Sequence, residues 1–252
     1  MTSDAPHNAP ARRVFLTAEW RHLLMLNYHV DPALLRPHVP AGTELDEFEG
    51  KTYVSMVGFM FLNTRVMGIP IPFHRNFEEV NLRFYVRRRT PQGLRRGVVF
   101  VREIVPRWAI AAVARVCYNE NYASMPMRHA IALLNGALGS GSELDYGWRH
   151  RGQWSSLRAT LTGAPAFAGE GSLEQFITEH YWGYSRQRDG GCVEYEVAHP
   201  PWRVWPVAKP ELTCDAARIY GHDFVNCLSA QPDSAFVAEG SAVEVCRGRR
   251  LA

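Results

Sequence analysis

Hydrophobic and polar residues alternate along several segments of this chain, and this alternation predicts β-strands. The clearest example is residues 77–89, FEEVNLRFYVRRR, whose two faces are Val80, Leu82, Phe84, Val86 and Glu79, Asn81, Arg83, Tyr85. Residues 97–105 are expected to pair with this strand as a hairpin through the loop TPQGLRR. Residues 51–63 carry apolar side chains on both faces, which predicts a central strand covered on both sides.

The remaining pattern predicts more strands and few helices. Strands are expected at residues 145–150, 154–163, 192–198 and 236–245, whereas residues 15–30 are mixed in period. Helices are expected at residues 33–39 after Asp31-Pro32, at residues 108–116, and at residues 172–185, where Ser172 and Gln175 match a capping box. Short strands separated by Gly and Pro predict a mainly β (α+β) fold, a closed β-barrel or sandwich with a few peripheral helices.

Composition and charge narrow the class of protein. We expect a disordered tail at residues 1–13 and one domain at residues 14–252, because no linker divides the chain. The formal charge is +3 and the longest basic tract is residues 87–89, which is too little for nucleic-acid binding. Five cysteines without a CxxC pair indicate reduced thiols and a cytoplasmic protein. No apolar run is long enough for a membrane helix, and no export signal is found.

The common catalytic and cofactor motifs are absent. The chain has no GxGxxG, GxxxxGK[ST], HExxH, GxSxG or EF-hand pattern. None of the ten histidines has a second at metal-ligand spacing, so His180 and His199 are individually more typical of structural residues. We therefore expect no metal and no cofactor.

Two polar groups of residues remain as candidates for a site. The face Glu79, Asn81, Arg83 and Tyr85 would be an ordinary solvated surface on an open sheet, but it would line the interior of a closed barrel. Both interpretations are kept open. Residues 109–126, AIAAVARVCYNENYASMP, place Arg115, Tyr118, Asn119 and Tyr122 at the end of an apolar helix. A polar helix end is favoured there over a catalytic corner.

Two aromatic groups complete the candidates. Residues 180–184, HYWGY, include Tyr181 and are better explained by core packing. In residues 198–206, AHPPWRVWP, two prolines fix the backbone beside His199, Trp202 and Trp205. This segment is equally consistent with a rigid aromatic wall beside a cavity and with a plug that fills a barrel.

These stretches, in this order and together with LLMLNY, VPAGTELDEFEG and VSMVGFMF, resemble the bacterial YqjF-like family, a domain of unknown function. The resemblance covers roughly residues 14–252. Members of that family look like relatives of the acetoacetate decarboxylase superfamily. The resemblance therefore implies an acetoacetate-decarboxylase-like barrel with a deep, mostly apolar cavity, often in a homo-oligomer.

The resemblance also bears on the chemistry. In the decarboxylases the segment similar to residues 109–123 ends in a lysine pair, one of which forms a Schiff base, but here that place falls at about Asn121-Tyr122. The only lysines are Lys51, in a Gly-Lys-Thr turn, and Lys209, in the expected loop VAKPEL, and both contexts predict exposure. The resemblance places Glu79 near a barrel glutamate and Arg115 near a Gly-Arg pair of those enzymes.

The sequence supports one leading function and one alternative. The first is a small-molecule-binding barrel. Such a barrel could act as an acid-base enzyme of the isomerase, dehydratase or cyclase type on an oxygenated organic acid or ketone. Its catalytic candidates are Glu79 as base and Tyr118 as acid, and its substrate-binding candidates are Asn81, Arg83, Arg115, Tyr122, Tyr181, His199 and Trp202. The alternative is a non-catalytic binding or interaction module on the same fold. The expected partner is a small molecule, with no nucleic acid and no membrane.

Overall fold

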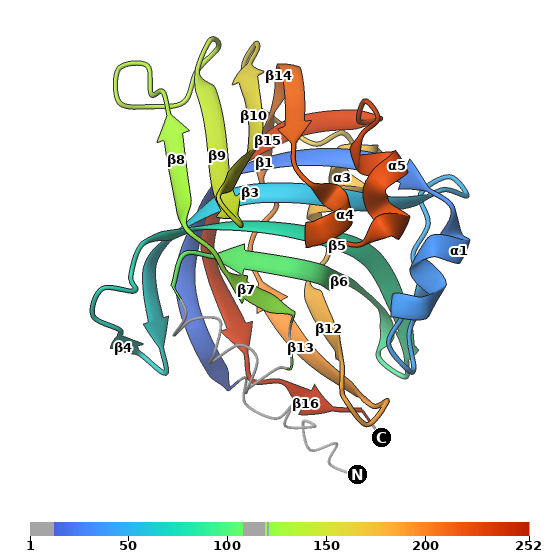
Figure 1. The fold of residues 1–252 in the computed structure, drawn as a ribbon. Helices are drawn as coiled ribbons and strands as arrows, with labels where there is room; N and C mark the ends of the chain where they lie inside the picture. Colours follow the sequence, from blue (N-terminus) through green and yellow to red (C-terminus); the bar gives the residue numbers. More distant parts are fainter. Residues whose placement is uncertain (1–12, 108–118, 120, 252) are drawn as a thin grey trace.

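The computed structural model of the chain describes residues 13–107, 119 and 121–251 (Figure 1). Most of this part is β-strand. The strands are β1 (Val14–Val30), β2 (Glu44–Leu45), β3 (Thr52–Val66), β4 (Ile69–Pro70), β5 (Phe77–Thr90), β6 (Gly93–Val105), β7 (Tyr122–Ser124), β8 (Met127–Ile131), β9 (Glu143–His150), β10 (Gln153–Leu161), β11 (Ala166–Phe167), β12 (Trp182–Arg186), β13 (Cys192–Ala198), β14 (Arg203–Thr213), β15 (Ser234–Cys246) and β16 (Arg249–Arg250).

The helices in the described residues are short and peripheral. They are α1 (Pro32–Leu35), η1 (Arg36–His38), α3 (Leu173–Thr178), α4 (Ala216–Ile219), η2 (His222–Phe224) and α5 (Val225–Leu228). Asp31 caps α1 by accepting a hydrogen bond from the Ala33 amide at 2.7 Å, with Pro32 in the first turn, as the sequence predicts. None of the helices described is long and apolar enough to cross a membrane.

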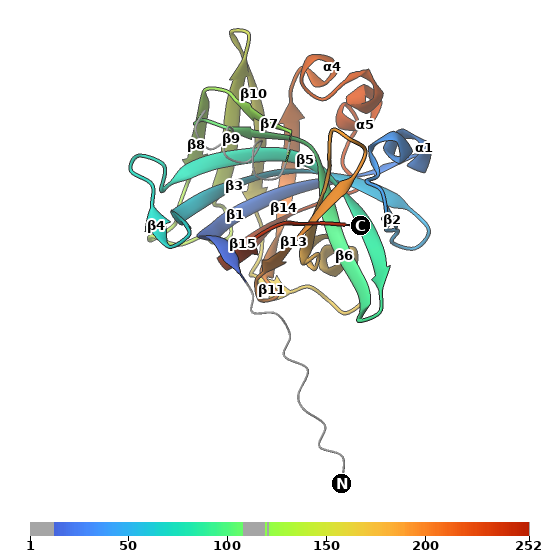
Figure 2. The ribbon, with the colours of Figure 1, turned by 90° about the horizontal axis from the view of Figure 1, so that it is seen from below.

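Seven strands form a closed ring. Their order is β13-β12-β6-β5-β3-β1-β15, and β15 pairs again with β13 through Val197 with Val245 and Ala198 with Glu244. All neighbours in the ring are antiparallel except β12 and β6. In Figure 1, β12, β13 and β16 lie below β5 and β6, and Figure 2 views the molecule from that side. The ring encloses an interior with its own hydrophobic side chains.

A second layer covers the outside of the ring. From β15 the sheet continues through β14, β10, β9 and β8, which run across β1, β3 and β5 in Figure 1. Tyr146, Trp148 and Leu157 of this layer pack with Leu24 and Met56 of the ring in one core cluster. A different cluster fills the inner face of the same strands. The central strands are therefore buried on both sides, which confirms the prediction for residues 51–63 and explains why their apolar residues do not alternate.

Residues 15–30, whose period is mixed in the sequence, lie within the single long strand β1. Its register against β3 shifts between Thr17 and Glu19 and again between Arg21 and Leu24, and His22 has a φ of 59°. Each irregularity moves the following side chains to the other face of the sheet. The alternation is lost in the sequence for this reason, although the strand itself is continuous.

The expected helix at residues 172–185 is too long. Ser172 does cap α3, since its Oγ accepts a hydrogen bond from the Gln175 amide at 3.2 Å, but the helix ends at Thr178. Residues 182–186 are instead strand β12, paired with both β13 and β6. Gly183 allows this pairing because a Cβ there would lie 2.1 Å from the Tyr195 ring. The apolar pattern of residues 173–181 thus runs from a helix into a loop.

The hairpin of β5 and β6 is confirmed, but its loop is shorter than expected. Pairing continues to Thr90 and Gly93, so most of TPQGLRR belongs to the strands.

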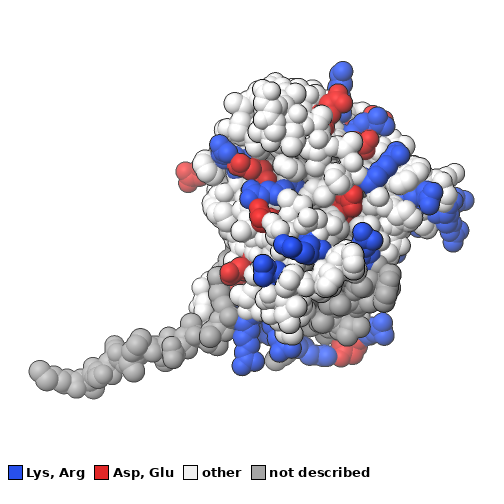
Figure 3. All heavy atoms as spheres, turned by 90° about the vertical axis from the view of Figure 1, so that its left-hand side faces the viewer, with Lys and Arg blue, Asp and Glu red and all other residues white. Residues whose placement is uncertain are grey.

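Charged side chains on the surface are mixed in sign, as Figure 3 shows for one face. None of the cysteines in the described residues forms a disulfide.

Candidate functional site

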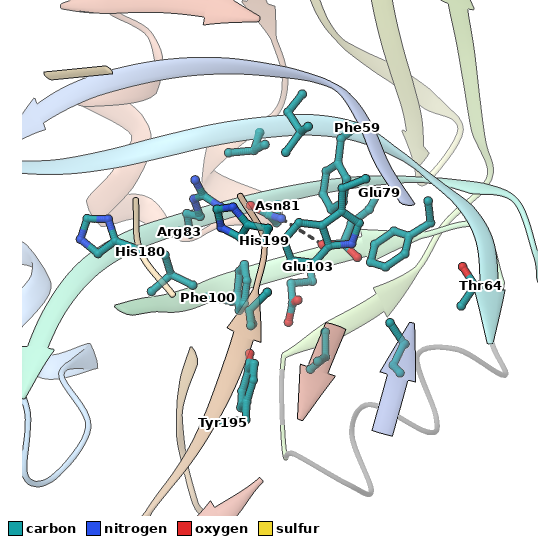
Figure 4. Close-up of a pocket in the computed structure, with 18 of the residues that line it drawn as sticks. Phe59, Thr64, Glu79, Asn81, Arg83, Phe100, Glu103, His180, Tyr195 and His199 are labelled. Atoms are coloured by element: carbon teal, nitrogen blue, oxygen red, sulfur yellow. Dashed lines mark hydrogen bonds between the residues drawn. The ribbon is translucent and has the colours of Figure 1, made fainter. Parts of the chain in front are cut away.

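The inner face of the ring surrounds a cavity of about 180 Å³ (Figure 4). Its walls are largely apolar and include Trp20, Leu23, Phe59, Phe61 and Phe77. A cavity of ~150 Å³ takes up benzene in another protein, and one water needs only ~10–15 Å³. The cavity therefore has room for a small organic molecule.

The polar face of β5 points into this cavity. Glu79, Asn81 and Arg83 all line it, and their exposed fractions are only 2%, 2% and 9%. Tyr85, the fourth residue of the face, is buried against Phe176 and does not line the cavity. Of the two interpretations of this face, the structure therefore shows the interior one.

Glu79 accepts two hydrogen bonds in the cavity. Asn81 Nδ2 donates to its Oε1 at 2.9 Å, and the Tyr122 hydroxyl donates to its Oε2 at 3.1 Å. Burial raises the pKa of Glu79 to about 7, against the hydrogen bonds from Asn81 and Tyr122 and the positive charge of Arg83, which lower it. A carboxyl group in this range can both take up and release a proton near neutral pH.

Tyr122 connects Glu79 to a second buried carboxyl group, that of Glu103. Strand β7 runs parallel to β6 and places Tyr122 beside Glu103, and Glu103 also lines the cavity. Burial raises the pKa of Tyr122 well above its ordinary value, and the neighbouring charges and hydrogen bonding of Glu103 and Glu79 act in the same direction. The phenol has a single proton, so it can donate a hydrogen bond to only one of the two carboxylates at a time. Gain or loss of a proton by one of the three groups therefore affects the protonation of the other two.

The sequence pattern does not single out Glu103, and the reason is a β-bulge. Leu82 pairs with Arg102 but Arg83 pairs with Phe100, so Val101 is an extra residue in β6. Strict alternation from Phe100 would turn Arg102 to the cavity. The bulge turns Glu103 inward instead. The adjacent Arg102 and Glu103 within an apolar strand were the only sequence signal.

Arg83 lies further along the same strand and is buried without a carboxylate contact among the described residues. Its Nη2 donates to the Ile177 carbonyl at 3.3 Å and contacts the Met25 sulfur at 3.9 Å. Its Nε has no hydrogen-bond partner in the described part of the chain. A guanidinium in this position favours a negatively charged group in the cavity, since burial of a charge is costly unless it is paired.

His180 also lines the cavity, and it is paired with a buried aspartate, Asp46. His180 Nε2 lies 3.2 Å from Asp46 Oδ2, which also accepts from Arg96 Nε at 2.7 Å. Burial alone would raise the pKa of Asp46, but the hydrogen bonds from His180 and Arg96 outweigh it and keep that pKa below its ordinary value. Burial lowers the pKa of His180 to about 4, although the bond to Asp46 opposes this. From the sequence, His180 is more typical of a structural residue, and nothing in the sequence singles out Asp46.

The aromatic candidates are divided by the structure. His199 and Trp202 both line the cavity and stack on each other with ring centroids 4.1 Å apart. Tyr181 lies 4.8 Å from the His199 ring but does not line the cavity, and Trp205 belongs to the outer core cluster. His199 and Trp202 thus form part of the cavity wall. Tyr181, Trp202 and Trp205 do not together fill the interior as a plug.

Two predicted residues, Arg115 and Tyr118, lie outside the described residues, as does the expected helix at residues 108–116. Asn119 is described, and its Nδ2 donates to the Arg186 carbonyl at 2.8 Å. The two lysines of the chain, Lys51 and Lys209, are exposed and do not line the cavity, and Lys209 lies in β14 rather than in a loop. Within the described ranges, no group of three His, Cys, Asp or Glu residues could hold a metal ion.

Solved structures of known enzymes share this fold. The enduracididine biosynthesis enzyme MppR complexed with pyruvate matches with a TM-score of 0.68 and 14% identity, over 98% of this chain and 93% of that one. Acetoacetate decarboxylase from Legionella pneumophila matches with a TM-score of 0.64 and 12% identity, over 100% and 93%. At these identities the similarity concerns the fold, which is the acetoacetate-decarboxylase-like fold expected from the sequence.

Sequence similarity identifies the family. The uncharacterized protein YqjF of Bacillus subtilis (strain 168) is 30% identical over 187 residues, which cover 73% of this chain and 72% of that protein. The model of the DUF2071 family, an uncharacterized conserved protein, matches residues 17–242. The match includes nearly every strand of the ring and all described polar residues of the cavity. This chain is therefore a YqjF-like member of the DUF2071 family.

Proposed function

We propose that this protein binds a small oxygenated organic acid or ketone in its cavity and catalyses proton transfer on it. The reaction would be an isomerisation, dehydration or cyclisation without a Schiff base. The observation that carries this proposal is the placement of Glu79 and Arg83 on one strand facing one apolar cavity. Four residues along a strand span about 13 Å, so a small molecule fits between a binding group and a proton-transfer group.

Arg83 is the binding group in this proposal. Its planar guanidinium is suited to a carboxylate, and an apolar surrounding strengthens that interaction. The complex of MppR with pyruvate supports the idea that this fold holds a small carboxylate. The apolar walls at Trp20, Phe59 and Phe61 would contact the rest of the molecule.

Glu79 is the proton-transfer group. With a pKa of about 7, it is present in both protonation states at neutral pH. Tyr122 joins it to Glu103, so a proton taken up by Glu79 can pass to a second carboxyl group. Tyr118, the acid expected from the sequence, remains a prediction.

Schiff-base chemistry has no support in the chain. A Schiff base needs an amine nucleophile, and both lysines are exposed and neither lines the cavity. Arginine cannot take that role because its guanidinium stays protonated. Acid-base chemistry by Glu79, Tyr122 and Glu103 is what the cavity offers.

Two measurements test the proposal. Binding of pyruvate and of other small 2-oxo acids, each compared with its amide, is measured by calorimetry. We expect acids to bind, amides to bind at least tenfold more weakly, and Arg83→Met to lose the difference. Arg158→Met, which changes an exposed arginine paired with Glu211, is the matched control and is expected to bind as the wild type does. Equal binding of acids and amides would contradict the role of Arg83.

Turnover is tested by proton exchange. Hydrogen at the carbon next to the carbonyl of a bound 2-oxo acid should exchange for deuterium in D₂O, followed by NMR. Glu79→Gln should slow this exchange by about 100-fold or more, the usual contribution of a general base. Binding by the wild type without any exchange would favour the alternative, a non-catalytic binding module.

A further inference from the structure

The end of the cavity at Arg83 contains more than one polar group. His180 and His199 both line the cavity, and Figure 4 shows Arg83 between them. The pKa of each imidazole is lowered to about 4, mainly by burial, and the positive charge of Arg83 acts in the same direction on both rings. His180 and Arg83 are also held against the same tyrosine, with the Tyr85 ring centroid 4.6 Å from the imidazole and 5.7 Å from the guanidinium carbon.

The hydrogen-bond partners decide which nitrogen of His180 carries its proton. A carboxylate only accepts hydrogen bonds, so the contact of His180 Nε2 with Asp46 requires a proton on Nε2. The ring is neutral at pH 7, so Nδ1 has a free lone pair. That nitrogen is buried and has no partner among the described residues. His180 therefore offers a hydrogen-bond acceptor at the cavity wall.

His199 has the same property with the other nitrogen. Its Nδ1 lies 2.9 Å from the Pro200 carbonyl, which can only accept, so Nδ1 carries the proton and Nε2 has the lone pair. Stacking on Trp202 fixes the plane of the ring. Arg83, by contrast, has only donors, and its buried Nε is without a partner in the described residues. This end of the cavity thus combines a positively charged donor with neutral acceptors.

A ligand that matches this end must accept from Arg83 and donate to an imidazole. A carboxylate meets the first requirement. The second needs an N–H or an O–H group, and a protonated amine is disfavoured beside the charge of Arg83. A neutral hydroxyl next to the carboxylate fits both. A 2-oxo group in the same place has no hydrogen to donate and would leave His180 Nδ1 without a partner.

We propose that the cavity is selective for 2-hydroxycarboxylates, with the carboxylate on Arg83 and the hydroxyl donating to His180 Nδ1. Asp46 is a positioning residue, because its hydrogen bond holds His180 in the tautomer that accepts. The apolar remainder of the cavity suits an aryl or alkyl group on the hydroxyl-bearing carbon. This inference rests on the proposed binding of an organic acid and specifies the class of acid.

The test compares three probes that differ at one carbon: 3-phenyllactate with a hydroxyl, phenylpyruvate with a carbonyl, and 3-phenylpropanoate with neither. Binding to the full chain is followed by calorimetry at pH 7. We expect 3-phenyllactate to bind about 3- to 10-fold more tightly than 3-phenylpropanoate, the usual range for one neutral hydrogen bond. Phenylpyruvate should show no such advantage.

Variants of His180 assign the advantage to one atom. His180→Gln keeps a donor near the position of Nε2 for Asp46 but removes the lone pair at the δ position, so the ratio of the two affinities should fall to about 1. His180→Asn keeps an acceptor at the δ position and should retain part of the ratio. His222→Gln, on an exposed 3₁₀ turn, is the matched control. An unchanged ratio in His180→Gln would overturn the inference.

A measurement on the wild type guards against variants that do not fold. In protein labelled with ¹⁵N at histidine, the chemical shift of His180 Nδ1 should change on addition of 3-phenyllactate. It should not change on addition of 3-phenylpropanoate. Equal binding of both probes, each lost in Arg83→Met, would reject the hydroxyl selectivity and leave the proposed function standing. Failure of every probe to bind would reject both.

Discussion

The hydroxyl of Tyr122 lies 3.1 Å from Oε2 of Glu79, and both residues line a cavity whose walls are largely apolar. This contact joins two segments that are 43 residues apart in the chain. Tyr122 comes from the short strand β7. The resemblance to the decarboxylases predicts their lysine pair at about Asn121-Tyr122, and this correspondence remains a prediction. The structure shows a phenol at residue 122 that donates a hydrogen bond to a buried carboxyl group.

The raised pKa of Glu79 predicts a dependence of stability on pH. The folded state holds the proton of Glu79 up to about pH 7, whereas the unfolded state releases it near 4.5. The contribution of Glu79 to the free energy of unfolding is therefore fully present below pH 4.5 and is lost as pH rises to about 7. The loss is at most about 3 kcal/mol. Urea unfolding of the wild type and of Glu79→Gln at pH 4.5 and pH 8 measures it.

Glu79→Gln stays neutral at both pH values, so its free energy of unfolding should fall less between them than that of the wild type. Glu47→Gln, at an exposed position, serves as the control and should follow the wild type. A wild type and a Glu79→Gln protein with the same change in stability would show that Glu79 has an ordinary pKa.

Removing the Tyr122 hydroxyl should raise the pKa of Glu79 further. The hydrogen bond from Tyr122 favours the ionised form of Glu79, so Tyr122→Phe removes a contribution that lowers the pKa. The protonation of Glu79 can be followed by carboxyl infrared spectroscopy, with Glu79→Gln used to assign the band. We expect the midpoint to lie above that of the wild type. Tyr53→Phe, outside the cavity lining, is the control, and a downward shift in Tyr122→Phe would contradict the assigned contact.

Much of the ring could be predicted from the alternation of side chains. The β5 and β6 hairpin and the doubly covered β3 follow from local patterns, because their backbones are regular where those patterns are clear. Residues 14–30 and 182–186 could not be assigned in this way. Their conformation depends on bulges and on pairing with strands distant in sequence, β15 for residues 14–30 and β6 for residues 182–186.

The candidate site shows the same division. Glu79, Asn81 and Arg83 are recognisable as a group because they share one regular strand. Glu103 was not predicted because a bulge changes its face, and the pairing of His180 with Asp46 was not predicted because the two residues meet across 134 residues of sequence. A polar face is visible in a sequence, but whether it faces water or an enclosed cavity depends on closure of the ring.

A buried carboxylate outside the cavity should be important for stability. The Glu194 side chain is fully buried and accepts hydrogen bonds from Arg95 at 2.6 Å, Arg249 at 2.9 Å and Arg88 at 3.3 Å. Glu194→Gln would leave these three guanidinium groups without their shared negative charge. We expect a loss of about 3–5 kcal/mol in the free energy of unfolding, the range for breaking a buried ion pair. Urea denaturation at pH 7 measures it.

The control for Glu194 is Glu239, whose carboxylate pairs with Arg203 at 2.8 Å on the surface. Glu239→Gln removes the same charge from a solvated pair, and such pairs contribute little to stability. Its effect should be a small fraction of that of Glu194→Gln. Similar losses in the two variants would mean that burial of Glu194 does not increase the strength of its contacts.

Gly240 provides a test of the packing that shapes the cavity wall. It pairs with Arg21 in β1, its φ is 79°, and a Cβ there would lie 1.9 Å from the Trp20 carbonyl oxygen. Gly190 has a similar φ of 85° but no atom within 4 Å of such a Cβ. Gly190→Ala should therefore lower the free energy of unfolding by only about 1–2 kcal/mol, the cost of a left-handed backbone conformation for a residue with a Cβ.

Gly240→Ala should cost clearly more than Gly190→Ala, since the strand must also move away from Trp20, which itself lines the cavity. Urea unfolding gives the difference between the two variants, and tryptophan fluorescence of the folded protein reports the displacement near Trp20. If both alanine variants lost the same free energy, the close approach of β15 to the backbone of Trp20 would not be a constraint on this fold. A larger loss in Gly240→Ala with changed emission would tie the position of this wall to a single glycine.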